Sequence, residues 1–244
     1  MKVITSSSNE HIKELVKLKN KKYRDEKKLF IIEGYHLVSE AKEYLTEVLI
    51  TDEKDCLEGV NNILVSKDII NKLASSCTPQ NIIGVCKYLN NDKLLGSKFL
   101  LLDNIQDPGN LGTLIRSSLG FGIDTIIASL DTVDIYNEKV IRATQGAIFN
   151  INYIKGDLIN YIGKLKNKGV CIIGTSLKSS KDLREVDKCS SYAIILGNEG
   201  SGVRGELLNQ TDFNIKIEMD EKLESLNVAV AGSIIMYNLY KKRC

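Results

Sequence analysis

Apolar positions in the carboxyl-terminal part of the chain form short continuous runs that alternate with amphipathic stretches. The runs predict strands at Phe99–Asn104, Thr125–Ala128, Val170–Gly174, Ala193–Gly197 and Phe213–Ile217. The stretches between them predict helices near Leu111–Leu119, Glu138–Phe149, Leu158–Lys166 and Asn227–Lys241. Because strands that are apolar throughout have helices on both faces, this part of the chain is predicted to be an α/β domain.

The amino-terminal part shows a similar alternation on a smaller scale. Residues 9–24 predict one helix, with Ile12, Leu15 and Val16 on its apolar stripe and Ser8 or Asn9 as its cap. Further along, the pattern predicts strands at Leu29–Gly34, Glu47–Thr51, Asn62–Val65 and Ile82–Tyr88 and helices at Tyr35–Tyr44 and near Lys67–Ala74. A polar run after residue 89 indicates a linker. We therefore expect two domains, residues 1–95 and residues 96–244.

Composition restricts the location and the chemistry. In a chain of 244 residues that is 43% hydrophobic, no apolar run approaches the roughly 20 residues of a membrane span. The first residues lack the apolar stretch of a signal peptide, so we expect a cytoplasmic protein with no membrane partner. The six cysteines include no CxxC pair, and neither His11 nor His36 has a neighbour typical of a metal site. Reduced thiols and no bound metal are expected.

Charge is distributed unevenly, although the net charge is only +2. Residues 1–28 hold nine Lys and Arg against four Asp and Glu, whereas the rest of the chain has a slight excess of acids. A basic amino end on a nearly neutral body suggests contact with a polyanion. A solvated helix face explains the same run equally well.

Three polar loops in the carboxyl-terminal part follow a strand or precede a helix. They lie at 107–112, 198–202 and 224–227. Ligands of open α/β sheets bind at the carboxyl ends of strands, so these loops are expected to meet at one site. In the helix after the first loop, the predicted inward stripe is Leu111, Leu114, Ile115, Ser118 and Leu119. Asn110 suits the cap of that helix and Arg116 points away from the stripe, so a capped turn and a surface arginine are the structural alternative.

One glycine-rich run is a candidate dinucleotide site. Gly200–Gly205 follows a strand and matches GxGxxG, and Glu218 stands where a ribose-binding acid is found in such sites. The segment Val203–Gln210 is short for the crossover helix of that fold, and Glu199 would bring negative charge towards a pyrophosphate. A nicotinamide-dependent oxidoreductase is therefore disfavoured.

The three loops together resemble the signatures of the SpoU/TrmH RNA ribose methyltransferases. Leu102–Ser117 (LDNIQDPGNLGTLIRS) resembles the first signature, Ile195–Gly202 (ILGNEGSG) the second and Ser225–Ala231 (SLNVAVA) the third. Arg142–Ala147 also resembles a family segment, in which serine often stands at the position of Thr144. The amino-terminal part, through Asn9, Arg24 and the strand that ends at Gly34, resembles a ribosomal-protein-like substrate-binding domain found on many members.

This resemblance implies a fold and a cofactor. It implies a small amino-terminal RNA substrate-binding α/β domain and a SPOUT α/β methyltransferase domain in which the carboxyl-terminal segment threads a loop to form a trefoil knot. The implied cofactor is S-adenosylmethionine. By resemblance, it would be held by backbone at Leu196, Gly197, Ile217 and Leu226, with Gly200 and Thr175 lining the same pocket. Members usually act as homodimers with a substrate site shared across the interface.

The implied reaction is methyl transfer to a ribose 2′-hydroxyl. Arg116 matches the family arginine credited with activating that hydroxyl. Because a guanidinium is a poor base, we expect Arg116 to position a phosphate and stabilise the 2′-oxygen. Residues 96–244 contain no histidine, so the final proton acceptor is left open. Asn110, Glu199 and Asn227 match the other polar positions of the family site.

RNA binding would fall to the amino domain, where the expected phosphate contacts are Lys17, Lys21, Lys22 and Arg24. The favoured substrate is 23S ribosomal RNA. A tRNA 2′-O-methyltransferase, a resistance-type methyltransferase of the same architecture and a non-catalytic RNA-binding module are the alternatives. The target nucleotide does not follow from the sequence.

Overall fold

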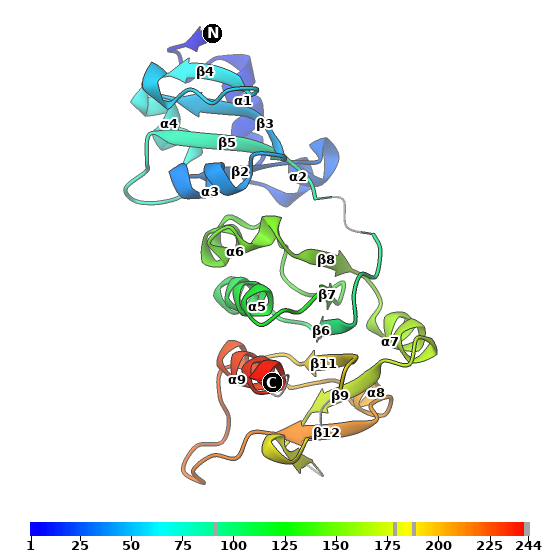
Figure 1. Cartoon of the computed structure of the whole chain (residues 1–244). Coiled ribbons are helices and arrows are strands. Elements are labelled where there is room, and N and C mark those ends of the chain that lie inside the picture. Colours follow the sequence, from blue (N-terminus) through cyan, green and yellow to red (C-terminus); the bar gives the residue numbers. More distant parts are fainter. Residues whose placement is uncertain (90–91, 178–179, 187–188, 242–244) are drawn as a thin grey trace. The chain divides into compact units, whose positions relative to one another are not determined.

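The computed structural model describes residues 1–89, 92–177, 180–186 and 189–241 (Figure 1). It divides into two compact units. The first unit comprises Met1–Asn90 and Asp134–Phe149, and the second comprises Asn91–Val133 and Asn150–Cys244. The sequence had placed the segment Asp134–Phe149 in the second predicted domain.

The second unit is built on a parallel sheet in the order β10-β12-β9-β11-β6-β7-β8. The strands are β6 (Lys98–Leu102), β7 (Thr125–Ala128), β8 (Asn152–Lys155), β9 (Cys171–Thr175), β10 (Lys181–Asp182), β11 (Tyr192–Leu196) and β12 (Phe213–Lys216). The helices are α5 (Pro108–Gly120), α7 (Leu158–Asn167), α8 (Gly205–Leu208) and α9 (Val228–Lys241). The predicted α/β fold with a helix-covered sheet is confirmed, whereas the short strands β8 and β10 were not predicted.

Successive side chains along the buried strands point to opposite faces of this sheet. Phe99, Leu101 and Ile195 belong to an apolar cluster with Leu158 and Leu207 from α7 and α8. Figure 1 shows α5 and α9 on the other side of the sheet from α7 and α8. On that side α9 approaches closely at Gly232, where a Cβ atom would lie 2.5 Å from Leu196 Cδ1 and 2.7 Å from Leu114 Cδ2.

Helix α5 begins differently from the prediction. Asp107 is its cap, because the Asp107 carboxylate accepts a hydrogen bond of 2.8 Å from Asn110 N, and Pro108 fits the first turn. The prediction that Asn110 is the cap is wrong, and its side chain is left for other contacts. The rest of the predicted stripe is buried, but Leu119 is 40% exposed, so its inward placement was also wrong.

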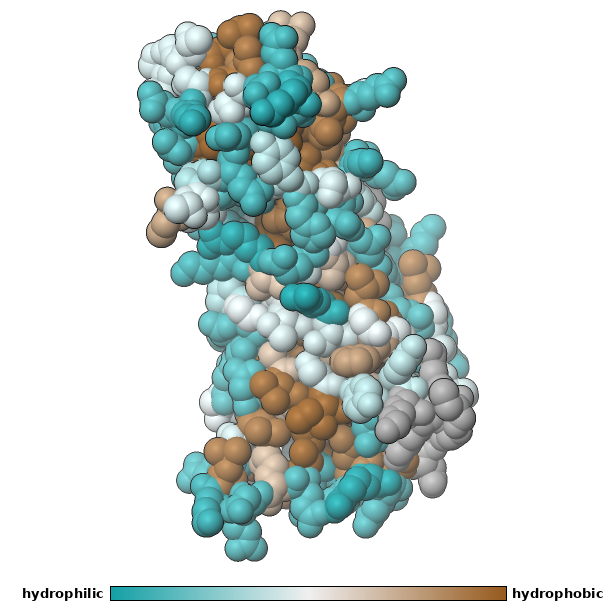
Figure 2. Space-filling view, turned by 60° about the vertical axis from the view of Figure 1, so that its left-hand side comes forward, coloured by the Kyte–Doolittle hydropathy of each residue, from teal (hydrophilic) through white to brown (hydrophobic). Residues whose placement is uncertain are grey.

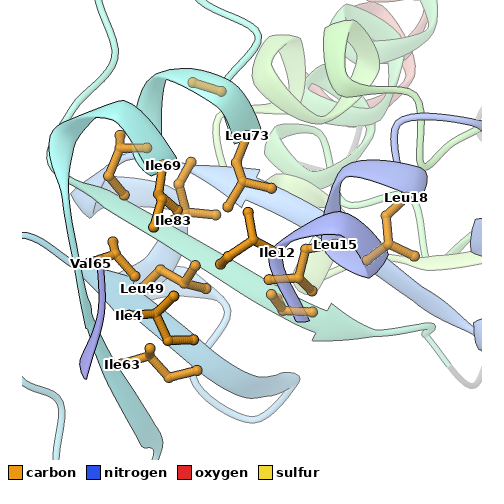
Figure 3. Packing of buried hydrophobic residues seen from close by; sticks show 13 residues of the cluster. Ile4, Ile12, Leu15, Leu18, Leu49, Ile63, Val65, Ile69, Leu73 and Ile83 are labelled. Atoms are coloured by element: carbon orange, nitrogen blue, oxygen red, sulfur yellow. The ribbon is translucent and has the colours of Figure 1, made fainter. Parts of the chain in front are cut away.

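The first unit contains a mixed sheet in the order β1-β4-β3-β5-β2. Its strands are β1 (Lys2–Ile4), β2 (Leu29–Glu33), β3 (Leu45–Ile50), β4 (Asn61–Val65) and β5 (Ile82–Lys87). Its helices are α1 (Glu10–Lys17), α2 (Lys21–Lys27), α3 (Tyr35–Glu40), α4 (Lys67–Leu73) and α6 (Glu138–Thr144). Ile12 and Leu15 of α1 pack with Ile69 of α4 over Leu49 and Ile83 of the sheet (Figure 3).

The single helix predicted over residues 9–24 is two helices. The side chain of Asn9 caps α1 by accepting a hydrogen bond of 2.9 Å from His11 N. Asn20 has extended backbone and caps α2 in the same way, through Lys22 N at 2.9 Å. The apolar stripe of the predicted helix ends before this break, and Asn20, which caps α2, is the signal that the prediction missed.

Arg24 of α2 is enclosed in the first unit and only 7% exposed. Its guanidinium donates hydrogen bonds to the carbonyl oxygens of Leu18 and Lys19 and lies 2.6 Å from the Asp134 carboxylate. A guanidinium held in this way is not presented to solvent. This corrects the expectation that Arg24 contacts an RNA phosphate.

Aromatic packing explains why Asp134–Phe149 belongs to the first unit. The ring of Tyr136 lies 3.9 Å from that of Tyr88 and 4.7 Å from that of Phe30, between ring centroids. Burial raises the pKa of Tyr136 to about 12. The helix predicted to reach Phe149 ends at Thr144, because Gln145 and Gly146 both have positive φ.

Two expectations from composition can be compared with this fold. Within the described ranges, no helix combines the length and the apolar character needed to cross a membrane. The cysteines of those ranges (Cys56, Cys77, Cys86, Cys171 and Cys189) are free thiols, and Cys244 lies outside them.

Candidate active site

Two of the predicted loops leave the neighbouring strands β6 and β11 and are joined by Asp103. Its backbone N–H donates to the carbonyl oxygen of Leu196, at 2.9 Å. Its buried carboxylate accepts hydrogen bonds from the backbone N and the Nε of Arg204, at 3.0 and 2.8 Å. Asp103 therefore ties both ends of the loop between Leu196 and Arg204 to the end of β6. A buried carboxylate that lost Arg204 would be left largely uncompensated.

The loop between those two ends is closed on itself. Asn198 and Gly202 exchange backbone hydrogen bonds of 3.1 and 2.9 Å. The side chain of Asn198 accepts from Gly200 N at 2.9 Å and donates to the carbonyl oxygen of Asn104 at 2.9 Å. A Cβ atom on Gly197 would lie 2.1 Å from backbone atoms of Gly202 and Val203, so only glycine fits there.

Three polar side chains from the three loops form one chain of hydrogen bonds. Asn110 Nδ2 donates to Glu199 Oε1 at 2.9 Å, and Asn227 Nδ2 donates to Asn110 Oδ1 at 2.9 Å. Asn227 Oδ1 accepts from Ala229 N at 2.9 Å, which caps α9. Asn110 thus has both ends of its amide engaged, one with each of the other loops.

Glu199 is held as an anion. Partial burial on its own raises the pKa of Glu199, but hydrogen bonds from Asn110 and from backbone N–H groups outweigh it, so the pKa is below its ordinary value. Those backbone donors include Asp107 N at 3.3 Å and Gln106 N at 3.4 Å. A carboxylate with a lowered pKa is a poor proton acceptor near neutral pH, so Glu199 is better suited to fixing the loops.

A cavity of about 670 Å³ opens beside this chain of hydrogen bonds. It is lined by Thr175–Leu177, Leu196–Val203, Ile215–Ile217, Met219, Glu224–Val228 and the α9 residues Ala231 and Ile235, together with Leu208. Its size lies within the range of about 300–1,000 Å³ that holds small ligands and cofactors. The loops after β9, β11 and β12 and apolar side chains from α9 therefore surround a space suited to a ligand with both polar and apolar parts.

The structure brings most of the predicted site residues to this place. The six residues expected to contact the cofactor all line the cavity: Thr175, Leu196, Gly197, Gly200, Ile217 and Leu226. Glu199 and Asn227 line it as well, and Asn110 reaches it through both of them. The hydroxyl of Thr175 already donates to the carbonyl oxygen of Ile195, at 2.8 Å.

Arg116 stands apart from the other predicted residues. It is exposed on α5 and is not among the residues that line the cavity. Within the part of the chain that the structure describes, no carboxylate forms an ion pair with it. Its guanidinium is available to a ligand that approaches from solvent.

Sequence reasoning missed three residues that shape this site: Asp103, Asn198 and Gln106. Asp103 had one usable signal, because it is a lone acid directly after the apolar run Phe99–Leu102 of β6. Gln106 and Asn198 lie inside the first and second signatures, but nothing in their residue type distinguished them from the other polar residues of those loops.

The dinucleotide alternative fails on the local structure. The helix after the glycine run is α8, which has only four residues and cannot act as a crossover helix. Glu218 forms an ion pair with Arg184 rather than standing free to meet a ribose.

Comparison with known proteins gives a consistent family. Residues 97–237 match the model of the SpoU rRNA Methylase family, and residues 9–84 match that of the MRM3-like substrate binding domain. The 23S rRNA (guanosine(2553)-2′-O)-methyltransferase RlmP of Bacillus subtilis is 38% identical over 98% of this chain and 99% of its own length. An rRNA methyltransferase from Sinorhizobium meliloti, solved with AdoMet bound, has a TM-score of 0.89 and 26% identity, covering 100% of this chain and 98% of that one.

The close approach at Gly197 predicts the effect of a single methyl group. Gly197→Ala should displace the loop from Gly197 to Val203, because the added methyl group would overlap backbone atoms of that loop. Overpacking of this kind costs about 1–3 kcal/mol. We expect affinity for S-adenosylmethionine, measured by isothermal titration calorimetry, to fall by about tenfold or more. Gly205→Ala is the matched control, since no atom lies within 4 Å of its added Cβ. Equal affinity of the two variants would contradict this role of Gly197.

Proposed function

We propose that this chain, which belongs to the SpoU rRNA methylase family, transfers a methyl group to a ribose 2′-hydroxyl of 23S ribosomal RNA. It is an S-adenosylmethionine-dependent methyltransferase. The observation that carries the proposal is the chain of hydrogen bonds from Glu199 through Asn110 to Asn227 beside the cavity. The activity named for the Bacillus subtilis relative supports the choice of RNA.

The cavity fits the cofactor of this family. The loop after β11 lines the cavity from Leu196 to Val203, and the close approach of Gly197 to Gly202 and Val203 holds this loop compact. We propose that Leu196, Gly197, Ile217 and Leu226 hold the cofactor, with Gly200 and Thr175 beside it. When bound, S-adenosylmethionine supplies an electrophilic methyl group.

We assign the polar residues to orientation rather than to proton transfer. Glu199 stays ionised and holds Asn110 and the N–H groups of the first loop. Asn110 in turn holds Asn227, whose side-chain oxygen caps α9. The three side chains therefore present a fixed polar edge to the ribose, and an edge that is already oriented stabilises developing charge without reorganising.

Arg116 is proposed to bind a phosphate next to the target ribose and to stabilise its 2′-oxygen. Its exposure and its lack of a carboxylate partner among the described residues leave its planar donors available. Arginine suits this role because it pairs with phosphate through two parallel hydrogen bonds.

A homodimer formed through α5 and α9 is the proposed assembly. Several large apolar side chains of these helices are exposed: Leu119, Val230, Ile234, Tyr237 and Tyr240. Figure 2 shows hydrophobic surface on the second unit. Leu119 lies three residues after Arg116, which puts both on one side of α5, so a second copy seated there would border the substrate site. A mass of 27.2 kDa in light scattering at micromolar concentration would contradict the dimer.

The trefoil knot stays a prediction. It is supported by the course of the chain after β12, since Asn227 returns to Asn110 at the start of α5 and Gly232 lies against Leu114. To get there, the segment between Lys216 and Asn227 passes the carboxyl ends of β9 and β11. The knot requires the carboxyl-terminal segment to pass through a loop formed by an earlier part of the chain. An experimental structure in which residues 217–241 pass outside every such loop would contradict it.

RNA binding is assigned to the predicted amino-terminal domain, residues 1–95, through Lys17, Lys21 and Lys22. Lys17 and Lys21 are exposed and pair with Glu14 and Asp25 on their own helices. Exposed ion pairs of this kind contribute little to stability, so a lysine can exchange its carboxylate partner for an RNA phosphate at a small cost in free energy. The same proposal places the protein in the cytoplasm, with the ribosomes.

The proposed activity is tested with labelled S-adenosylmethionine and total RNA that lacks the native modification. We expect label in 23S RNA, and ribose-methylation mapping should find one stoichiometric 2′-O-methyl site. Label in transfer RNA would contradict the ribosomal substrate and favour the tRNA enzyme. Binding of S-adenosylmethionine without transfer to any free RNA or ribosomal particle would favour the non-catalytic module.

Substituting the exposed arginine tests its role directly. Arg116→Lys keeps the charge but loses the planar fork, so we expect turnover to fall by about 100-fold, the scale of losing one preorganised donor. Single-turnover rates and calorimetric affinity for S-adenosylmethionine are the measurements, and the affinity should be unchanged. A near-normal rate would remove Arg116 from the site.

Neutralising the basic helices tests the RNA contacts. In Lys17→Gln/Lys22→Gln, the slope of log affinity against log salt should flatten by about 0.7–0.9 for each phosphate contact that is lost. Lys54→Gln is the control, because this lysine is also exposed and also pairs with a nearby carboxylate, that of Asp52, but lies outside α1 and α2. If the double variant and the wild-type protein gave equal slopes in filter-binding titrations, Lys17 and Lys22 would not contact RNA and would only be solvated residues of the helix surface.

A further inference from the structure

Leu130 exposes 66% of its surface in the turn that follows β7. This turn, residues 129–132, is held firmly. Thr132 N donates to the carbonyl oxygen of Ser129 at 3.2 Å, and the two side-chain hydroxyl oxygens are 3.1 Å apart. Thr132 Oγ1 also donates to the carbonyl oxygen of Leu102 at 3.2 Å. The leucine is therefore presented to solvent by a turn that has little freedom to fold it away.

We infer that this turn is a subsite for an unpaired nucleobase of the RNA substrate, with Leu130 as its apolar platform. The inference rests on the proposed function and adds to it the place where a base of the substrate lies. Two further observations support it: the order of the strands, and the hydrogen bonds between the turn and the loop after β6.

The strand order puts the turn on one side of Asn110 and Glu199, and the cavity proposed for the cofactor on the other side. The order is β12-β9-β11-β6-β7, and these strands are parallel, so their carboxyl ends share one edge of the sheet (Figure 1). The cavity lies at the ends of β12, β9 and β11, and Asn110 follows β6. A ribose that meets both Asn110 and the cavity contents has its base, or the next nucleotide, on the β7 side.

Gln106 connects the turn to the carboxylate of Glu199. Its backbone N–H donates to Glu199 Oε2 at 3.4 Å, and its side-chain amide donates to the carbonyl oxygen of Asp131 at 2.8 Å. Beside it, Asn104 N donates to Ser129 Oγ at 2.9 Å. The platform is thus fixed relative to Glu199 through one intervening residue, which a subsite needs if it is to orient a nucleotide for reaction.

The chemistry of the turn suits a nucleotide. The Leu130 side chain offers an apolar surface to the face of a base, and side chains of this kind contact unstacked bases in nucleic-acid complexes. The turn carries charges of both signs, because the ammonium group of Lys155, at the end of β8, donates to the carbonyl oxygen of Thr132, and the exposed Asp131 stands next to Leu130. The apolar side chain of Leu130, rather than a net charge, is therefore what this turn offers to a base.

The test compares Leu130→Ala with Leu95→Ala. Leu95 is the matched control, because it is 53% exposed but precedes β6, at the opposite end of the sheet. The measurements are KM for the RNA, affinity for S-adenosylmethionine, and melting temperature. Leu130→Ala should raise KM for RNA by about tenfold, the scale of losing one base contact. Cofactor affinity and melting temperature should be unchanged, and Leu130→Phe should retain low KM, since a ring is also a platform.

Outcomes for this subsite and for the proposed function are separable. The wild-type protein tests the function, and RNA affinity in filter-binding titrations reads the contribution of Leu130 even if no methyl group is transferred. An unchanged KM and RNA affinity in Leu130→Ala would overturn the subsite, and so would equal losses in Leu130→Ala and Leu95→Ala. A fall in melting temperature or cofactor affinity without a change in RNA binding would also overturn it, because the turn would then have only a structural role.

Discussion

The hydrogen bonds that run from Glu199 through Asn110 to Asn227 are the interaction on which the site depends. They join residues 89 and 117 positions apart in the chain, each from a different loop at the carboxyl edge of one parallel sheet. Asn110 is free for this only because Asp107 takes over the capping of α5. The ionised state of Glu199 follows from the same contacts, since the donors that lower its pKa are the residues it holds in place.

In the proposed arrangement, the order of the strands puts the two substrates on separate sides. The cavity proposed for the cofactor lies at the ends of β12, β9 and β11, and the turn with Leu130 follows β7 on the other side of the polar residues after β6. Methyl donor and ribose would then approach the same amide and carboxylate from opposite directions. Asp103 stabilises this arrangement, because its carboxylate ties the loop after β11 to the end of β6.

Much of this site followed from the sequence, because its residues lie in short motifs next to strongly apolar strands. Thr175, Gly197 and Leu226 were expected at a ligand pocket and line the cavity. The break between α1 and α2 had one signal, Asn20, a residue type that favours helix caps, but the prediction carried a single helix across it.

Other features depend on partners that are distant in the sequence. Arg24 looked like one of several exposed basic residues, and only the Asp134 carboxylate and two backbone carbonyls explain its burial. The same holds for Tyr136, whose stacking on Tyr88 groups its segment with the first unit. Local pattern carries no information about contacts of this range.

The most direct test of the account is to measure Asn110→Ala by two methods, calorimetric binding of S-adenosylmethionine and the single-turnover rate of methyl transfer. Asn110 touches Glu199 and Asn227 but does not line the cavity. The account predicts cofactor affinity within about threefold of wild type and a rate lower by about 100-fold, as expected when preorganised polar groups lose their orientation. A normal rate with normal affinity would contradict it, because the three loops would then be aligned without the contact proposed to align them.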